Sequence, residues 1–506
     1  TNLANGNYVV TWADSSGHDG GSGWDVWGQM YSEDGLSVGE DFRVNSYVSS
    51  SQYHPDITAL SDGGFVVAWS DSSGHNGGSG WDIRTQRFDS SGSSVGEEAL
   101  VNSYTSGSQY VPSVGALLDG GFVVTWEDHS SGSHGGTLHD VYGQRFDVNG
   151  DPTGEEFRVN ETQVSGYQYT PEVVGLANGG FAISWRDDDG SSHNDGKGSG
   201  SSIDVWLRVF NADGSEAAGE IRVNETQISG SQYEPALASL SNGDFIVTWR
   251  DSDGGSHDDG TGTGSSNDVW ARIFNEDGTE VVGEFRINNY TSSSQYEPDV
   301  TALKDGGFVV TWRDDSGYDG GSGSDIRAQV HSNDGAVILP EFMVNTYITG
   351  SQYQPTVAAL DDGGFVISWT SQYQDGSNTG VYSQRFDANG SALSTIRLTG
   401  GSGDEIVNFV DAQEEMLIDL GAGNDTLNLG DNADSVRVQS VENVSLGGGD
   451  DTAIIEGVDG VRIDAGAGND RITSGDGSDT LIGGLGNDPY TVNDSGDVVV
   501  ENAGEG

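Results

Sequence analysis

The chain has 506 residues, with 80 acidic against 20 basic side chains, a formal net charge of -60, 79 glycines and no cysteine. Because such an acidic surface repels nucleic acids, we expect no nucleic-acid partner. No run of about 18 apolar residues occurs, so we expect no direct membrane insertion. Without cysteine, a structural cation would need hard oxygen ligands, and calcium fits this composition best.

An apolar run that ends in tryptophan recurs seven times along the first four fifths of the chain, at intervals of 57 to 64 residues. These tryptophans are Trp12, Trp69, Trp126, Trp185, Trp249, Trp312 and Trp369. In each full unit, a Gln-Tyr-x-Pro segment precedes this run, and two more short alternating runs follow it. Glycine, aspartate and asparagine turns separate the runs. This pattern predicts four antiparallel strands per unit.

Seven four-stranded units predict a seven-bladed β-propeller over residues 1–398 of an all-β chain. A string of small sandwiches or an open solenoid remains as an alternative. The Gln-Tyr-x-Pro segment occurs only six times, because the first unit starts at its turn. We therefore expect the first blade to lack its first strand, and the chain to be part of a larger polypeptide.

After residue 398, tryptophan disappears, and residues 465–491 repeat with a strict nine-residue period that places Asp470, Asp479 and Asp488 at equivalent positions. The repeat resembles the glycine-rich nonapeptide G-G-x-G-x-D-x-U-x of RTX proteins, among them large bacterial RTX adhesins. The resemblance implies a calcium-binding parallel β-roll or β-helix over residues 399–506, truncated at its C-terminus. It further implies a bacterial protein that leaves the cell by type I secretion and works outside the cell or at the cell surface.

The resemblance also implies calcium ligands. Glycine carbonyls and the sixth-position aspartate of stacked turns would supply the oxygens, and the apolar eighth position would point inward. The expected ligands are Asp425, Asp451, Gly466, Gly468, Asp470, Gly475, Gly477, Asp479, Gly484, Gly486 and Asp488. Asp425 and Asp451 belong to single, weaker copies of the motif. Solvated Asp-Gly turns are the alternative interpretation.

The long loop after each blade tryptophan is rich in aspartate and forms a second candidate calcium set. Its members are Asp14, Asp19, Asp25, Asp71, Asp82, Asp189, Asp204, Asp253, Asp268, Asp315 and Asp325. In a propeller, these loops lie on the same face as the Gln-Tyr-x-Pro segments, which suits calcium-bridged sugar binding. The alternatives are solvated loops, purely structural calcium, and repeated Gln and Tyr side chains that lock neighbouring blades together.

The function that these features favour is recognition or adhesion, with extracellular carbohydrate or cell-surface material as the partner. A structural spacer or surface-layer component is one alternative. A polysaccharide-degrading enzyme such as a lyase is another, for which Arg186, Arg250 and Arg313 are candidate residues. The tryptophans that end the apolar runs are expected in the core. Others could be core residues or sugar platforms, namely Trp24, Trp27, Trp81, Trp206 and Trp270.

Overall fold

The chain forms two compact all-β units, Thr1–Ser391 and Ala392–Gly506, in a computed structural model. The structure describes residues 1–15, 23–32, 35, 37–75, 80–130, 138–161, 166–188, 203–225, 230–252, 267–290, 293–317, 323–372, 379–393, 396–399, 406–408, 415–420, 424–430, 434–455 and 460–501. Among these residues, no helix is long and apolar enough to cross a membrane.

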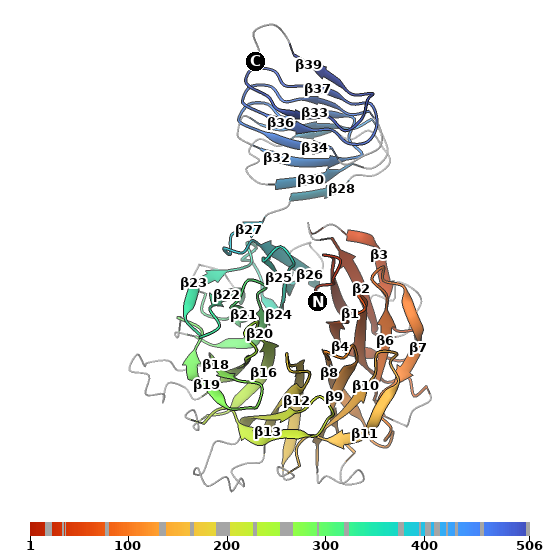
Figure 1. The fold of residues 1–506 in the computed structure, drawn as a ribbon, viewed down its shortest axis with the longest axis vertical. Helices are drawn as coiled ribbons and strands as arrows, with labels where there is room; N and C mark the ends of the chain where they lie inside the picture. Colours follow the sequence, from red (N-terminus) through yellow and green to blue (C-terminus); the bar gives the residue numbers. More distant parts are fainter. Residues whose placement is uncertain are drawn as a thin grey trace. The chain divides into compact units, whose positions relative to one another are not determined.

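The first unit is a seven-bladed propeller, as predicted, with its blades arranged around a central axis (Figure 1). Six sheets have four strands, and the first has the three strands β1–β3. Blades one to four contain β1 (Tyr8–Asp14), β2 (Asp25–Tyr31), β3 (Ser37–Arg43); β4 (Gln52–Ala59), β5 (Phe65–Asp71), β6 (Asp82–Phe88), β7 (Ser94–Leu100); β8 (Gln109–Ala116), β9 (Phe122–Asp128), β10 (Asp140–Phe146), β11 (Pro152–Arg158); and β12 (Tyr167–Gly175), β13 (Phe181–Asp188), β14 (Asp204–Phe210), β15 (Glu216–Arg222). Blades five to seven contain β16 (Gln232–Ser239), β17 (Phe245–Asp251), β18 (Asp268–Phe274), β19 (Glu280–Arg286); β20 (Gln295–Ala302), β21 (Phe308–Asp314), β22 (Asp325–His331), β23 (Val337–Met343); and β24 (Gln352–Ala359), β25 (Phe365–Gln372), β26 (Thr379–Phe386), β27 (Ala392–Leu393).

The propeller core lies between adjacent blades. One buried cluster joins Val66 and Ala68 of the second blade to Phe122, Val124 and Trp126 of the third. The strands that end in tryptophan are buried on both faces, which explains their continuous apolar sequence. Five of these tryptophans, Trp69, Trp126, Trp185, Trp249 and Trp312, have no exposed surface.

Each innermost strand contains a bulge at its Gln-Tyr-x-Pro segment. In the second blade, pairing with β5 shifts register between Tyr53 and Asp56, and the other five segments shift at the same place. The residue before each proline adopts a left-handed conformation with φ between 46° and 54°. These residues are His54, Val111, Thr170, Glu234, Glu297 and Gln354. A non-glycine residue pays for this conformation, so its sixfold repetition marks the strand end as a candidate functional position.

The second unit is a parallel β-solenoid, which confirms the predicted fold. It has two six-stranded parallel sheets, and in each sheet a strand from one coil pairs with the strand from the next coil (Figure 1). One sheet contains β28 (Ile396–Thr399), β30 (Glu415–Asp419), β32 (Ser435–Gln439), β34 (Thr452–Ile455), β36 (Arg471–Thr473) and β38 (Tyr490–Thr491). The other contains β29 (Ile406–Asn408), β31 (Thr426–Asn428), β33 (Asn443–Ser445), β35 (Arg462–Asp464), β37 (Thr480–Ile482) and β39 (Val498–Val500).

The solenoid core is a stack of inward-facing apolar side chains. Ile472 and Leu481 are fully buried in it, and the partly buried Tyr490 packs against it. Parallel pairing aligns Ala453 with Ile472, and Ile472 with Tyr490. The eighth position of the nonapeptide therefore faces inward.

Candidate functional site

At six junctions, a buried hydrogen-bond network of asparagine, glutamine and aspartate side chains connects neighbouring blades. We call each network an amide clasp. Between the second and third blades, Asn102 Nδ2 donates to Asp82 Oδ1 at 2.9 Å and to Gln109 Oε1 at 3.1 Å. Asn102 Oδ1 accepts from Ile83 N at 2.7 Å, and Gln109 Nε2 donates to Asp128 Oδ1 at 3.2 Å. Each buried carboxylate thus has amide donors from its own chain, as buried polar groups require.

The other five clasps repeat this arrangement, with Ser371 in place of the last aspartate in the seventh blade. They consist of Asn45, Asp25, Gln52 and Asp71; Asn160, Asp140, Gln168 and Asp187; Asn224, Asp204, Gln232 and Asp251; Asn288, Asp268, Gln295 and Asp314; and Asn345, Asp325, Gln352 and Ser371. The repeated glutamines therefore join blades, in line with the locking alternative.

The clasps contain most of the described aspartates of the propeller calcium set. The members in clasps are Asp25, Asp71, Asp82, Asp204, Asp268 and Asp325. Asp14 lies opposite Asp25 in the β1–β2 ladder, and Asp315 accepts a hydrogen bond from Arg313 Nε at 3.0 Å. Asp19, Asp189 and Asp253 lie outside the described residues.

Guanidinium groups also neutralise some clasp carboxylates. Arg84 Nε lies 2.6 Å from Asp71 Oδ2, and Arg327 Nε lies 2.7 Å from Asp314 Oδ2, in ion pairs that are almost fully buried. Nowhere in the described ranges do three or more histidine, aspartate or glutamate side chains form a group that could hold a metal ion. A cation would therefore need backbone carbonyls among its ligands.

In the solenoid, the predicted aspartates fall into two columns along the coils. Asp451, Asp470 and Asp488 belong to one column, in which Asp451 N donates to Asp470 Oδ1 and Asp470 N donates to Asp488 Oδ1, both at 2.8 Å. Asp434 N starts this column by donating to Asp451 Oδ1 at 2.7 Å. Gly466, Gly468, Gly484 and Gly486 lie in the turns that lead into it.

The second column contains Asp425 and Asp479. Asp425 N donates to Glu442 Oε2 at 2.7 Å, and Asp479 N donates to Asp497 Oδ1 at 2.9 Å. Gly475 and Gly477 lie in the turn before Asp479, whose Oδ2 accepts from Gly475 N at 3.2 Å. Sequence reasoning missed Asp434, Glu442 and Asp497, because they lie outside clear copies of the nonapeptide.

Close stacking of the turns explains their glycines. Gly466 and Gly484 have φ values of 95° and 91°. A Cβ atom on Gly466 would lie 1.9 Å from Gly447 O, and one on Gly484 would lie 2.0 Å from Gly466 O. No side chain fits at these two positions.

The first solenoid column has carboxylate oxygens without partners. Oδ2 of Asp451, Asp470 and Asp488, and both carboxylate oxygens of Asp434, are buried and lack hydrogen bonds in the described part of the chain. Burial raises the pKa of Asp451 to about 7 and the pKa values of Asp434 and Asp470 to about 6. Hard oxygens of this kind suit calcium, and a site here would need backbone carbonyls of the glycine turns beside these carboxylates, since no three acidic side chains of the described residues form a metal-binding group.

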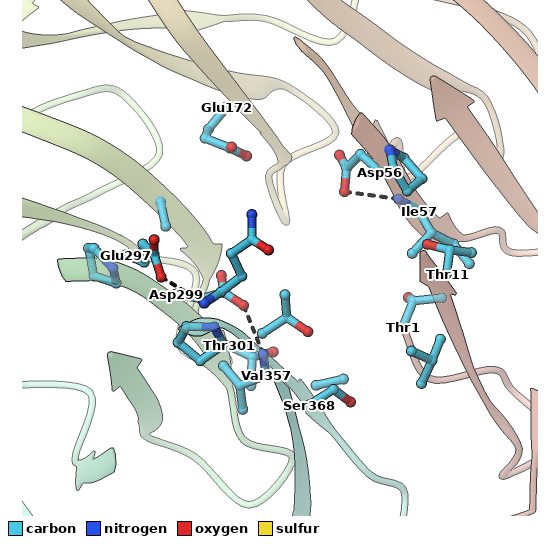
Figure 2. Close-up of a pocket in the computed structure, with 18 of the residues that line it drawn as sticks. Thr1, Thr11, Asp56, Ile57, Glu172, Glu297, Asp299, Thr301, Val357 and Ser368 are labelled. Carbon is cyan, nitrogen blue, oxygen red and sulfur yellow. Dashed lines mark hydrogen bonds between the residues drawn. The ribbon is translucent and has the colours of Figure 1, made fainter. Parts of the chain in front are cut away.

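An axial cavity of about 750 Å³ lies at the centre of the propeller. The innermost strands and β1 line it, and five carboxylates face it, from Asp56, Glu172, Glu234, Glu297 and Asp299. Figure 2 shows four of them around the hollow: Asp56 on β4, Glu172 on β12, and Glu297 and Asp299 on β20.

Two of these carboxylates connect neighbouring innermost strands. Asp56 Oδ2 accepts from Val114 N at 2.6 Å, and Asp299 Oδ2 accepts from Val357 N at 2.8 Å (the latter drawn in Figure 2). Burial raises the pKa of Asp299 to about 6 and also raises the pKa values of Asp56 and Glu172. These acids therefore have a structural role, because they satisfy edge-strand amides at the cavity wall.

Aromatic rings and guanidinium groups form a continuous belt beside the cavity, from the first to the sixth blade. We name it the aromatic–guanidinium belt; its members are Trp24, Tyr53, Trp81, Tyr110, His129, His139, Tyr169, Arg186, Tyr233, Arg250, Tyr296 and Arg313. Between successive members, the two ring centres, or the guanidinium carbon and the ring centre, lie between 3.6 and 5.6 Å apart. In blades four to six, arginines alternate with tyrosines as cation–π pairs.

Ion pairs connect this belt to the cavity lining. Arg250 Nη2 lies 3.4 Å from Glu234 Oε1, and Arg313 Nη1 lies 3.8 Å from Glu297 Oε1. Both glutamates line the cavity. The belt therefore contacts the cavity lining at these two glutamates, where aromatic rings, carboxylates and guanidinium groups lie together, a combination that suits polar ligands with apolar faces.

The structure separates the tryptophans whose role the sequence left open. Trp27, Trp206 and Trp270 are buried, whereas Trp24 is 37% exposed and Trp81 is partly exposed, both within the belt. Arg186, Arg250 and Arg313, the candidate residues of an enzyme, are belt members as well. The tyrosines of the belt were predictable from the repeated Gln-Tyr pair, but their alternation with arginine depends on contacts between blades.

No protein-family model and no curated protein matches the chain. Among solved structures, a protein of unknown function from Dyadobacter fermentans is 13% identical, covers 66% of this chain and 93% of its own, and has a TM-score of 0.44. An α-L-arabinanase from Penicillium chrysogenum, complexed with arabinobiose, is 12% identical, with coverages of 67% and 93% and a TM-score of 0.41. The polysaccharide lyase Uly1 is 11% identical, with coverages of 76% and 89% and a TM-score of 0.45. Similarities this low carry no argument about function.

Proposed function

We propose that the propeller is an extracellular recognition or adhesion module that binds carbohydrate where the aromatic–guanidinium belt borders the axial cavity. The observation that carries this proposal is the pairing of Arg250 with Glu234 and of Arg313 with Glu297, with each guanidinium also lying over a tyrosine ring. Sugars combine apolar ring faces with hydroxyl groups. Aromatic faces and charged hydrogen-bonding groups at one border are therefore suited to them.

The direct test is retention of the full chain on a panel of neutral and acidic glycans, with product formation followed in the same samples. We expect retention without products. Tyr296→Ala removes a ring between Arg250 and Arg313 and should weaken binding at least tenfold, since a stacking contact is lost. Tyr290→Ala is the matched control, because Tyr290 contacts Arg327 in the same way but is not a belt member.

Two outcomes of this test favour other functions. Cleavage products would support the polysaccharide lyase alternative. Burial raises the pKa of Tyr169, the belt tyrosine whose ring contacts both histidines, which opposes its use as a catalytic base at neutral pH. If no glycan were retained, the structural spacer or surface-layer function would be the better explanation.

For the solenoid, we propose calcium binding by the column of Asp434, Asp451, Asp470 and Asp488. Their buried oxygens without partners support it, together with the nonapeptide pattern. Bound calcium would neutralise carboxylates that otherwise repel one another along the column. The RTX assignment, type I secretion and location outside a bacterial cell belong to the same proposal. Terbium luminescence of the full chain, with competition by calcium, tests for the site, and Asp470→Asn should reduce the signal.

A calcium role of the propeller aspartates is less well supported. Six of the described candidates already have amide donors in the clasps. A variant such as Asp82→Asn should therefore leave the calcium stoichiometry of the full chain unchanged. A lower stoichiometry would restore the calcium interpretation of this set.

A further inference from the structure

The junction between blades four and five has a belt arginine but lacks the glutamate that accompanies the belt arginine at the next two junctions, and this difference indicates the chemical class of the ligand. At four junctions, a side-chain oxygen accepts the N–H of the left-handed residue that precedes proline. Val111 N donates to Ser70 Oγ at 3.1 Å, and Thr170 N donates to Glu127 Oε1 at 2.7 Å. In blades six and seven, the acceptors are glutamates of the preceding blade.

The two glutamate junctions combine an N–H group, a carboxylate and a guanidinium. Glu234 Oε2 accepts from Glu297 N at 2.8 Å, while its other oxygen faces Arg250. Glu297 Oε2 accepts from Gln354 N at 2.6 Å, while its other oxygen faces Arg313. One carboxylate thus bridges a backbone donor and a belt arginine at each junction.

The junction between blades four and five has the same donors but no such carboxylate. Thr170 stands at the repeat position of Glu234 and Glu297, and Arg186 stands at the position of Arg250 and Arg313. In the described part of the chain, no side-chain oxygen accepts from Glu234 N, and Arg186 has no acidic partner. Thr170 Oγ1 is buried without a hydrogen bond, and so is Arg186 Nε, as Arg250 Nε is at the next junction. By the equivalence of the repeats, Glu234 N and the Arg186 guanidinium border the position that a glutamate carboxylate occupies at the next two junctions.

Arg186 is held so that only its edge is free for a ligand. Its guanidinium carbon lies 4.8 Å from the Tyr169 ring centre and 5.0 Å from that of Tyr233. Hydrogen bonds can then form only in the guanidinium plane, the geometry in which arginine binds a carboxylate.

We propose that this junction binds the carboxylate of a uronic acid residue in the carbohydrate ligand. The proposal rests on the proposed function and narrows it from carbohydrate to acidic carbohydrate. The ligand carboxylate takes the place of the absent glutamate and accepts from Arg186 and Glu234 N. Tyr167, 37% exposed and stacked 5.9 Å from Tyr169, offers an aromatic face beside the site, which favours a sugar over an acidic peptide.

The test uses the full chain with a galacturonate oligosaccharide and its carboxyl-reduced, neutral counterpart, measured by isothermal titration calorimetry. We expect the acidic oligosaccharide to bind at least tenfold more tightly, and Arg186→Gln to abolish that preference. Thr170→Glu places the missing carboxylate beside Arg186 and should have the same effect with the fold intact. Thr170→Gln, of nearly equal size but neutral, should retain most of the preference.

Each outcome supports or overturns the inference. Equal binding of the two oligosaccharides, or a preference that survives in both Arg186→Gln and Thr170→Glu, overturns it while carbohydrate recognition stands. Failure to retain any glycan overturns the proposed function itself. Competition by polyglutamate but by no uronate would identify an acidic peptide as the ligand and also overturn the inference. Thermal unfolding of each variant separates loss of binding from loss of the fold.

Discussion

The propeller and the solenoid both bury repeated aspartates, but they differ in what these side chains contact. In the propeller, Asp82 accepts from Asn102, and Asp71 accepts from Gln52 and Arg84. In the solenoid, Asp451 and Asp470 each keep a buried oxygen without a hydrogen bond, and burial raises their pKa values. Regular spacing of acidic residues therefore does not distinguish a metal site from a structural network. The hydrogen-bond donors that surround each carboxylate distinguish the two cases.

The largest effect that this comparison predicts is on removal of calcium. If the proposed site exists, millimolar calcium should raise the midpoint of thermal unfolding of the solenoid by more than about 10 °C, because the ion would bind only the folded column. The propeller transition should not move. Differential scanning calorimetry of the full chain, with calcium and with a chelator, measures both transitions.

Variants test whether the calcium-dependent shift in the unfolding midpoint comes from the column of Asp434, Asp451, Asp470 and Asp488. Asp470→Asn preserves an acceptor for Asp451 N but removes a charge, and should reduce the calcium-dependent shift. Asp277→Asn, in an exposed propeller turn, should not. Equal shifts of both transitions by calcium would break the comparison, since the propeller would then contain calcium sites of its own.

The second largest effect should follow from opening one clasp. Asn102→Ala leaves Asp82, Gln109 and Ile83 N without their amide partner. We expect the free energy of unfolding of the propeller to fall by about 3 kcal/mol, since buried polar groups lose their hydrogen bonds. Urea denaturation followed by tryptophan fluorescence measures the loss. Asn149→Ala, in an exposed turn, should cost no more than about 0.5 kcal/mol.

A third prediction concerns pH. The pKa of Asp299 is raised to about 6 by burial, from an unfolded value near 3.8, so its protonated form favours the fold. This contribution is present below about pH 4 and is lost as the pH rises through 6. The propeller should therefore lose about 2 kcal/mol over this range. Asp299→Asn should reduce the slope of stability against pH, and an unchanged slope would contradict the assignment.

Much of the fold was predictable from the sequence, because strands, turns and coils are local and repeated. A turn precedes each Trp-ending run in the chain, and each nonapeptide places its eighth residue inward. The clasps and the belt were harder to predict, because each one joins two blades. A signal for the clasps exists in retrospect: Asp82, Asn102 and Gln109 recur with nearly constant spacing in six units. The sequence did single out Arg186 together with Arg250 and Arg313, but it could not separate Arg186 from the other two, because the difference depends on glutamate contacts between blades.

The smallest predicted effect concerns the stability cost of left-handed backbone conformations, which differ between the propeller and the solenoid. In the described solenoid, left-handed positions are glycines apart from Ser440, whereas the propeller places Val111 at φ 47° beside the cavity. A β-branched residue there costs about 1 kcal/mol, and asparagine tolerates the conformation better. Val111→Asn should therefore raise propeller stability by about 0.5 kcal/mol in urea denaturation. Val95→Asn, at an exposed position of the regular strand β7, should lower it slightly. If both variants destabilise equally, the left-handed positions store no strain, and their sixfold repetition reflects only the geometry of the bulge.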